Sequence, residues 1–209
     1  MTKPPVILVF GENDHDREVL VILVRALHPS APRPEKRRKP LILIKDRNQA
    51  AAKKSAADTA NQVRIERRIR KVPFVVAHQD CDAIEPAHIH HSTQIESILR
   101  EHDVEAVAAT PAWETESWLY LWPDAAPMVQ RTWRRPNRDG SRVGLIPDAK
   151  EAFRRDVRPP GTRCRDYEES DAPRIVEAAV RAGLLRRPAA VSESYDRFVA
   201  RLSDVAKAT

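Results

Sequence analysis

The stretch that most constrains the fold is residues 73–82, PFVVAHQDCD. Its apolar first half, Pro73 to Ala77, is rich in β-branched and aromatic residues and predicts a buried strand. Asp80 and Asp82 follow, and the residues just past the carboxyl end of a strand are where open α/β sheets bind ligands. Hard divalent cations select oxygen ligands. The stretch therefore predicts a metal-dependent α/β domain.

Strand and helix signals alternate along the rest of the chain. Strands are predicted at 5–10, 41–44, 73–77 and 104–109, and helices at 17–27, 49–71, 86–102, 171–184 and 192–206. Strands that each precede a helix predict a mainly parallel sheet with helices on both faces, followed here by a helical C-terminal extension. We expect an α/β domain at 1–125. Residues 126–209 should supply a basic loop region and C-terminal helices packed on that domain, and residues 28–40 an exposed loop.

Composition excludes several classes of protein. The chain has no run of eighteen apolar residues and no signal-peptide layout, which predicts a cytoplasmic protein without a membrane partner. It lacks both glycine-rich phosphate-binding motifs, GxGxxG and GxxxxGK[ST]. Its two cysteines, Cys81 and Cys164, are too few for a disulfide framework. Cys81 lies between two aspartates, which oppose a thiolate, so we do not expect a catalytic thiol.

The chain carries a net charge of +6 and a pI near 9.6, which favours a polyanionic partner. Helical spacing puts a basic stripe on one face of the predicted helix 49–71 and Ile65 and Ile69 on another. A solvated amphipathic helix explains this stripe as well as phosphate contacts do. A second basic cluster surrounds Trp133, a candidate for stacking on a base. The candidate nucleic-acid-binding residues are Arg64, Arg67, Arg68, Arg70, Lys71, Arg131, Arg134 and Arg135.

Four stretches in order resemble a known family. They are VFGENDHDREVL at 9–20, VVAHQDCDA at 75–83, WETESWLYLWP at 113–123, and the C-terminal pair YEESDAPRIVEAAVRAG and SESYDRFVARL. Together they resemble the small standalone Toprim-type proteins of prokaryotes, relatives of OLD-family nucleases and RloB-like proteins. The resemblance implies a Mg²⁺-dependent nuclease, in a group often linked to phage defence and to an ATPase partner.

The Toprim pattern implies that a glutamate after the first strand and a later DxD jointly hold Mg²⁺ (or Mn²⁺). Phe10 stands where the usual glutamate precedes the glycine, and Glu12 is the candidate replacement. The expected metal ligands are Asp80, Asp82 and Asp14. Glu12 and Glu116 are the candidate general acid and base. His78, close to the DxD, is a candidate supporting residue.

Other interpretations stay open at this point. Asp14 and Asp16 also fit simple helix capping, and Glu116 fits a salt bridge. A non-catalytic subunit that binds nucleic acid or docks on an ATPase explains the same charges. A receiver-type signalling domain would use Asp46 as its phospho-acceptor. The sequence leaves open whether the nucleic acid is DNA or RNA, whether the site is active, and whether the protein is a homodimer.

Overall fold

The computed structural model describes residues 3–38, 49–161 and 165–208. The described chain forms two compact units. Unit 1 comprises residues 1–79, 89–110 and 196–209, and unit 2 comprises residues 80–88 and 111–195. The division of the chain at residue 125 that the sequence suggests is not tested by these units and stays a prediction. No described helix combines the length and apolar character needed to cross a bilayer.

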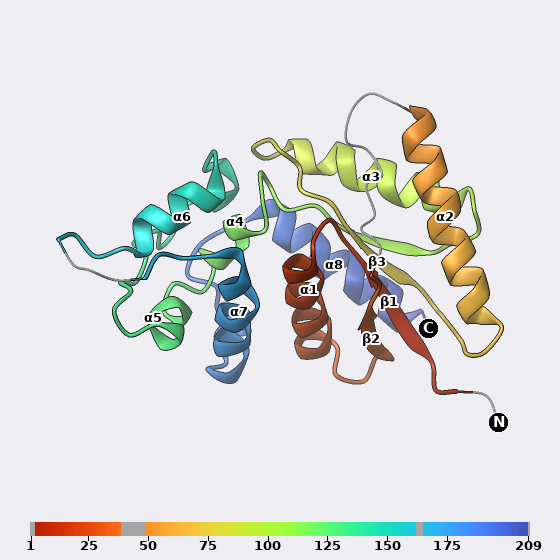
Figure 1. Cartoon of the computed structure of the whole chain (residues 1–209), viewed down its shortest axis with the longest axis horizontal. Coiled ribbons are helices and arrows are strands. Elements are labelled where there is room, and N and C mark those ends of the chain that lie inside the picture. Colours follow the sequence, from red (N-terminus) through yellow and green to blue (C-terminus); the bar gives the residue numbers. More distant parts are fainter. Residues whose placement is uncertain (1–2, 39–48, 162–164, 209) are drawn as a thin grey trace. The chain divides into compact units, whose positions relative to one another are not determined.

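Unit 1 is built on a four-stranded, all-parallel sheet in the order β2-β1-β3-β4 (Figure 1). Its strands are β1 (Val6–Phe10), β2 (Arg33–Lys36), β3 (Val75–His78) and β4 (Ala106–Ala109). Leu8 is in register with Val75, and Val75 with Ala106. All residues of β1, β3 and β4 are buried, as expected of parallel strands that are covered on both faces. The predicted α/β fold class is confirmed.

Helices cover both faces of this sheet. α2 (Gln49–Arg67) and α3 (Ala87–Arg100) pack on the face formed by Val6, Leu8 and Phe10, through a shared core that includes Ala60 and Leu99. α1 (Asp14–Leu27) and α8 (Glu193–Lys207) lie on the other side of the sheet in Figure 1, and His28 and Ser203 join them by a hydrogen bond of 3.1 Å. Burial of these apolar faces is the main stabilising term of the unit.

Unit 2 is helical and packs around aromatic side chains. Its helices are α4 (Glu116–Leu119), α5 (Ala125–Val129), α6 (Ala149–Val157) and α7 (Ala172–Arg181). The ring of Tyr195 packs edge-on against both Trp118 and Trp122. The ring of Phe153 packs in the same way, with centroids 5.1 Å from those of Tyr120 and Tyr167.

Several sequence predictions differ from the structure. β2 lies inside the stretch 28–40, which was expected to be an exposed loop, while the predicted strand at 41–44 falls outside the described residues. The helix predicted at 49–71 ends at Arg67. Ile65 and Ile69 are exposed, so the apolar stripe of that helix is formed by other residues, Ala56, Ala60 and Val63. The basic loop region expected to begin at residue 126 contains most of α5 and all of α6.

A buried carboxylate organises the interior of unit 2. Glu85 is 3% exposed, and its Oε1 accepts hydrogen bonds from the Ser192 hydroxyl (3.0 Å) and the Ser194 backbone N–H (2.8 Å). Its backbone N–H donates to the carbonyl of Gly144 (2.9 Å). A Cβ added at Gly144 would lie 2.0 Å from the Glu85 carboxyl carbon. Only glycine therefore fits at position 144 while these hydrogen bonds are kept.

We predict that Gly144→Ala lowers the free energy of unfolding by about 1–3 kcal/mol, the usual cost of overpacking a well-packed interior. Urea denaturation measures the loss. In a Glu85→Ala background the same substitution should cost less, because the clashing carboxylate is gone. Equal stability of Gly144→Ala and the wild type would contradict the packing described here.

Candidate nucleic-acid interface

The carboxyl edge of the unit 1 sheet carries a paired set of charges. Asn13 caps α1, its side chain accepting from the Asp16 N–H at 2.9 Å. Asp14 accepts from Lys36 (3.0 Å) and Arg17 (3.3 Å), and Lys36 also pairs with Glu18 (2.6 Å). The hydrogen bond from Lys36 is the largest of the influences on the pKa of Asp14, and with the help of Arg17 it lowers that pKa against the opposing effect of burial. Asp14 thus already has two cationic partners.

The adjacent strand ends place His78 and Asp16 together. β1 and β3 are neighbours and the chain leaves them toward opposite sides of the sheet, which makes their carboxyl ends the switch point of the fold. His78 is 1% exposed, and its Nδ1 lies 3.8 Å from Oδ2 of Asp16. Glu12, in the loop after β1, is half-buried. His78 therefore lies at the carboxyl end of β3 beside a carboxylate of α1, and its supporting role stays a prediction.

Asp80 and Asp82 belong to unit 2, where they flank Cys81 in a turn fixed by backbone hydrogen bonds. The N–H groups of Cys81 and Asp82 donate to the carbonyls of Pro111 and Trp113, each at 3.1 Å. Asp82 adopts a left-handed backbone conformation, with φ of 49°. Burial, aided by the charges of both aspartates, raises the pKa of the Cys81 thiol to about 11. The thiol is therefore protonated at neutral pH, which agrees with the prediction that it is not catalytic.

The expected general acid or base Glu116 is an interior residue of unit 2. It is 5% exposed, and its Oε1 accepts a hydrogen bond of 2.9 Å from the Tyr167 hydroxyl. Burial, followed by the charge of Glu116, raises the pKa of Tyr167 well above its ordinary value. No group of three or more His, Cys, Asp or Glu side chains arranged to hold a metal occurs among the described residues. The expected ligand set of Asp14, Asp80 and Asp82 stays a prediction.

Several of the basic residues predicted on unit 1 already form hydrogen bonds or ion pairs with neighbouring residues. Arg70 binds both carboxylate oxygens of Glu35 (3.0 and 2.6 Å) and also Glu66 (2.5 Å), so it ties β2 to the end of α2. Arg67 donates to the carbonyl of Asp103, and Arg64 to the side chain of Asn61. Arg68 and Lys71 are exposed but lie beyond the end of the helix. The predicted stripe is therefore no continuous helical face.

One stretch of unit 2 is strongly basic. Residues 131–166 hold eleven lysines and arginines against five aspartates and glutamates, an excess of six that equals the net charge of the whole chain. The remaining residues are balanced. Eleven acidic and four basic residues make up the charges in the rest of unit 2, so the attraction of this stretch for a polyanion is local and is not a property of the unit as a whole.

Helix α6 explains how these arginines reach the surface. Its buried residues, Ala149, Ala152, Phe153 and Val157, follow helical spacing and face the aromatic interior. The same spacing turns Arg154 and Arg155 outward, and Arg158 follows directly after the helix. We call Arg134, Arg138, Arg154, Arg155 and Arg158 the arginine surface; the first is exposed, and the other side chains are 35, 38, 69 and 55% exposed, respectively.

Asp156 holds much of this surface in place. Its Oδ2 accepts from the Tyr120 hydroxyl (3.0 Å) and from Arg138 (2.9 and 3.2 Å), and its Oδ1 from Arg155 (3.3 Å). Its backbone carbonyl accepts from Nε of Arg134 (2.7 Å). Burial alone would raise the pKa of Asp156, but the hydrogen bonds from Arg138 and Tyr120 outweigh it and lower that pKa.

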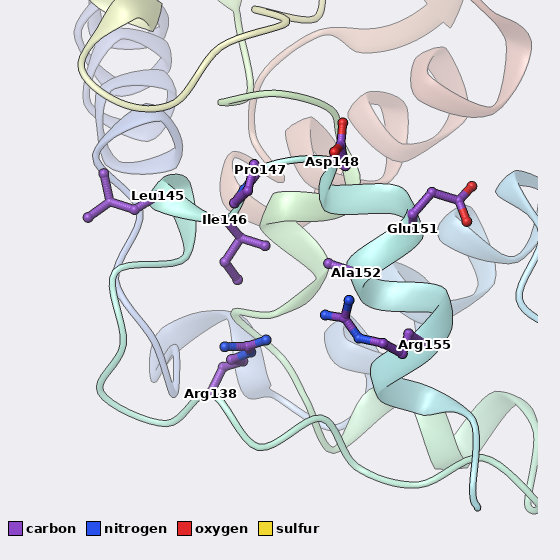
Figure 2. A pocket seen from close by; sticks show the side chains of 8 residues that line it. All are labelled: Arg138, Leu145, Ile146, Pro147, Asp148, Glu151, Ala152 and Arg155. Atoms are coloured by element: carbon purple, nitrogen blue, oxygen red, sulfur yellow. The ribbon is translucent and has the colours of Figure 1, made fainter.

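The arginine surface surrounds three neighbouring depressions. The largest, about 790 Å³, is lined by four of the five arginines, all but Arg138, together with Glu151 and residues 159–161. Arg155 and Glu151 also line a second depression of about 430 Å³, shown in Figure 2, whose other walls include Ile146 and Arg138. Arg134 and Arg138 share a third, of about 420 Å³. Each depression therefore shares a guanidinium with the next.

Two residues predicted at this surface have other partners. Arg135 is bound by Asp124 (2.7 Å) and Asp139 (2.8 Å), which balance its charge. Trp133 is 3% exposed, donates to the carbonyl of Arg165 (2.7 Å) and packs under that guanidinium, so its prediction as a platform for a base is wrong. Arg131 is exposed, and Arg134 belongs to the arginine surface. Sequence reasoning missed Arg154, Arg155 and Arg158, although the local excess of charge is visible in the sequence.

We predict that Asp156→Asn lowers the free energy of unfolding by about 1–3 kcal/mol at neutral pH, because it weakens charge-assisted hydrogen bonds in a partly buried network. The folded pKa of Asp156 is lowered, so its contribution is present above its unfolded pKa and is lost as the pH falls through the folded pKa. The difference between variant and wild type should therefore shrink below about pH 4.

Urea denaturation from about pH 7 to about pH 3 measures this difference. Asp204→Asn, at an exposed position of α8, is the matched control and should change stability little at any pH. A constant difference between Asp156→Asn and wild type across this range would contradict the assigned role of the carboxylate.

Comparison with known proteins yields no relative: no protein-family model, no curated protein and no solved structure matches the chain. The structure itself shows an α/β domain with a four-stranded parallel sheet.

Proposed function

We propose that the protein binds nucleic acid through the arginine surface of unit 2. The observation that carries this proposal is the set of five arginines around three connected depressions, accompanied among the described residues by four carboxylates, Asp148, Glu151, Asp156 and Asp166. Arginine donates several hydrogen bonds in a planar fork that matches phosphate. Arg134 donates from Nε to a neutral carbonyl, and no ion pair joins it to a carboxylate in the described part of the chain, so its charge is available to a ligand.

The geometry favours phosphates over isolated small anions. Contacts with phosphates supply most of the affinity of nucleic-acid-binding proteins, and several guanidinium groups in a row can follow a backbone. Asp156 and Tyr120 hold Arg138 in one orientation, which reduces the entropy that binding must overcome. The basic stretch at 64–71 is a weaker candidate for phosphate binding, because the charge of Arg70 is already paired with Glu35 and Glu66.

We predict that Arg155→Glu combined with Arg158→Glu weakens nucleic-acid binding at least about tenfold. The reason is that both substitutions replace phosphate-binding groups by repelling ones. Fluorescence anisotropy with a labelled oligonucleotide, at several salt concentrations, measures the affinity. The slope of log K against log salt should also become shallower, by about 0.7–0.9 for each phosphate contact removed.

Arg64→Glu combined with Arg68→Glu is the matched control for that experiment, because it changes the net charge equally but on unit 1. It should reduce affinity much less. The same loss in both double variants would show that net charge alone matters, and a loss confined to the control would place the interface on the stretch predicted at 64–71. Either result, or no binding by the wild type, would contradict the proposal.

A second candidate function is Mg²⁺-dependent cleavage of a phosphodiester bond, and the turn at Asp80 and Asp82 favours it. The two carboxylates are separated by one residue, on a backbone fixed by hydrogen bonds to Pro111 and Trp113. Two carboxylates are enough for Mg²⁺, because it keeps several waters and takes few protein ligands. A metal there would neutralise charge on the phosphate and activate a water. The resemblance to Toprim-type nucleases supports this candidate.

We predict for this candidate that wild-type protein binds Mn²⁺ or Mg²⁺ in calorimetry and that Asp80→Asn with Asp82→Asn abolishes the binding. Cleavage of labelled DNA or RNA should be lost in parallel. Glu101→Gln with Asp103→Asn is the matched control, because these exposed carboxylates have the same spacing and Asp103 also has positive φ. Equal metal binding by both double variants would rule out the aspartate pair as the metal site.

A further inference from the structure

Part of the wall of the depression in Figure 2 is formed by the side chains of Leu145, Ile146 and Pro147. The side chain of Ile146 and the guanidinium groups of Arg138 and Arg155 face a common space beside Ala152. Ile146 is half-buried, and Ala152 is 5% exposed at the foot of the depression. The volume, about 430 Å³, lies within the range of small-molecule sites, roughly 300–1,000 Å³.

Charge and shape together limit what this space can accept. Two guanidinium planes and an aliphatic side chain offer flat and apolar contacts, the kind on which an unstacked base rests. Every Phe, Tyr and Trp among the described residues is buried except Trp113, which is half-buried, so no exposed aromatic ring is available for this purpose. No aromatic side chain is among the residues that line this depression, so its guanidinium groups are the flat groups on which a base can stack.

The arginines of the neighbouring, larger depression can bind the phosphate of the same ligand. Arg155 lines both spaces, and beyond it stand Arg134, Arg154 and Arg158. A nucleotide with its base beside Ile146 would carry its phosphate past Arg155 into the larger depression. Bases in a duplex are paired and stacked, so their faces are not available to such a site, whereas an unpaired nucleotide presents them.

We propose that unit 2 selects single-stranded nucleic acid, with an unpaired base in the depression beside Ile146 and phosphates in the arginine-lined depression next to it. This inference rests on the proposed binding function and adds the class of nucleic acid. Arg155 contacts both the base and the phosphate in this arrangement. Arg138, fixed by Asp156 and Tyr120, forms the opposite wall for the base.

The test compares single strands with duplexes on full-length protein. The probes are fluorescein-labelled oligothymidine and oligouridine of about 20 nucleotides, which exceeds common single-strand site sizes, and the corresponding duplexes with their complements. Wild-type protein should bind at least one single strand more tightly than the duplexes. Ile146→Gln, which removes apolar contact without adding charge, should weaken single-strand binding about three- to tenfold and leave duplex binding unchanged.

Two further variants make the outcomes distinct. Met128→Gln makes the same kind of change at an exposed residue of α5, outside the depression, and should leave both affinities unchanged. Arg155→Ala should weaken both, and circular dichroism checks that each variant is folded. Equal wild-type affinity for single strands and duplexes, or an equal effect of Ile146→Gln on both, would overturn the inference while leaving nucleic-acid binding intact. Binding to neither probe would overturn the proposed function itself.

Discussion

The arrangement of the arginine surface depends on one carboxylate, that of Asp156. It joins the aromatic interior of unit 2, through the hydroxyl of Tyr120, to guanidinium groups at the surface. Without this acceptor, Arg138 and Arg155 would lose their shared partner, and like charges would repel one another across α6. A single partly buried anion thus allows several cations to stand close together and still leaves an excess of positive charge.

The two units differ in how they use charge. In unit 1 the conspicuous acidic and basic side chains are largely matched: Asp14 with Lys36 and Arg17, and Arg70 with Glu35 and Glu66. In unit 2 the five arginines of the arginine surface lie among four carboxylates, Asp148, Glu151, Asp156 and Asp166, although acidic residues slightly outnumber basic ones in the unit as a whole. The parallel sheet therefore provides a stable scaffold with a compensated edge, while the helical unit carries a local cluster of arginines and the aspartates of the candidate metal turn.

Much of the sheet could be predicted from the sequence because β1, β3 and β4 are apolar runs that need burial on both faces. β2 could not, since its residues Arg33–Lys36 include a proline and three charged side chains, and it becomes a strand only by pairing with β1. The prediction that Ile65 and Ile69 form an apolar helical face was wrong, because α2 buries Ala56 and Ala60, leaves Ile65 exposed and ends before Ile69.

The candidate site was predictable only in outline. Excess charge marks 131–166, yet it does not tell Arg135, balanced by Asp124 and Asp139, from Arg155, whose side chain is 69% exposed. That distinction depends on contacts between distant residues, as does the burial of Trp133. Glu116 likewise stands in a motif that resembles a catalytic one, and only tertiary packing reveals its hydrogen bond to Tyr167.

The most direct test of the central claim is chemical footprinting of arginines. Modification with an arginine-specific dicarbonyl reagent, followed by mass spectrometry, reports which guanidinium groups a bound oligonucleotide covers. If nucleic acid binds at the arginine surface, Arg155 and Arg158 are protected, while Arg64 and Arg68 react as fast as in the free protein. Protection at Arg64 and Arg68 instead, or equal reactivity everywhere under conditions where the oligonucleotide is bound, would contradict it.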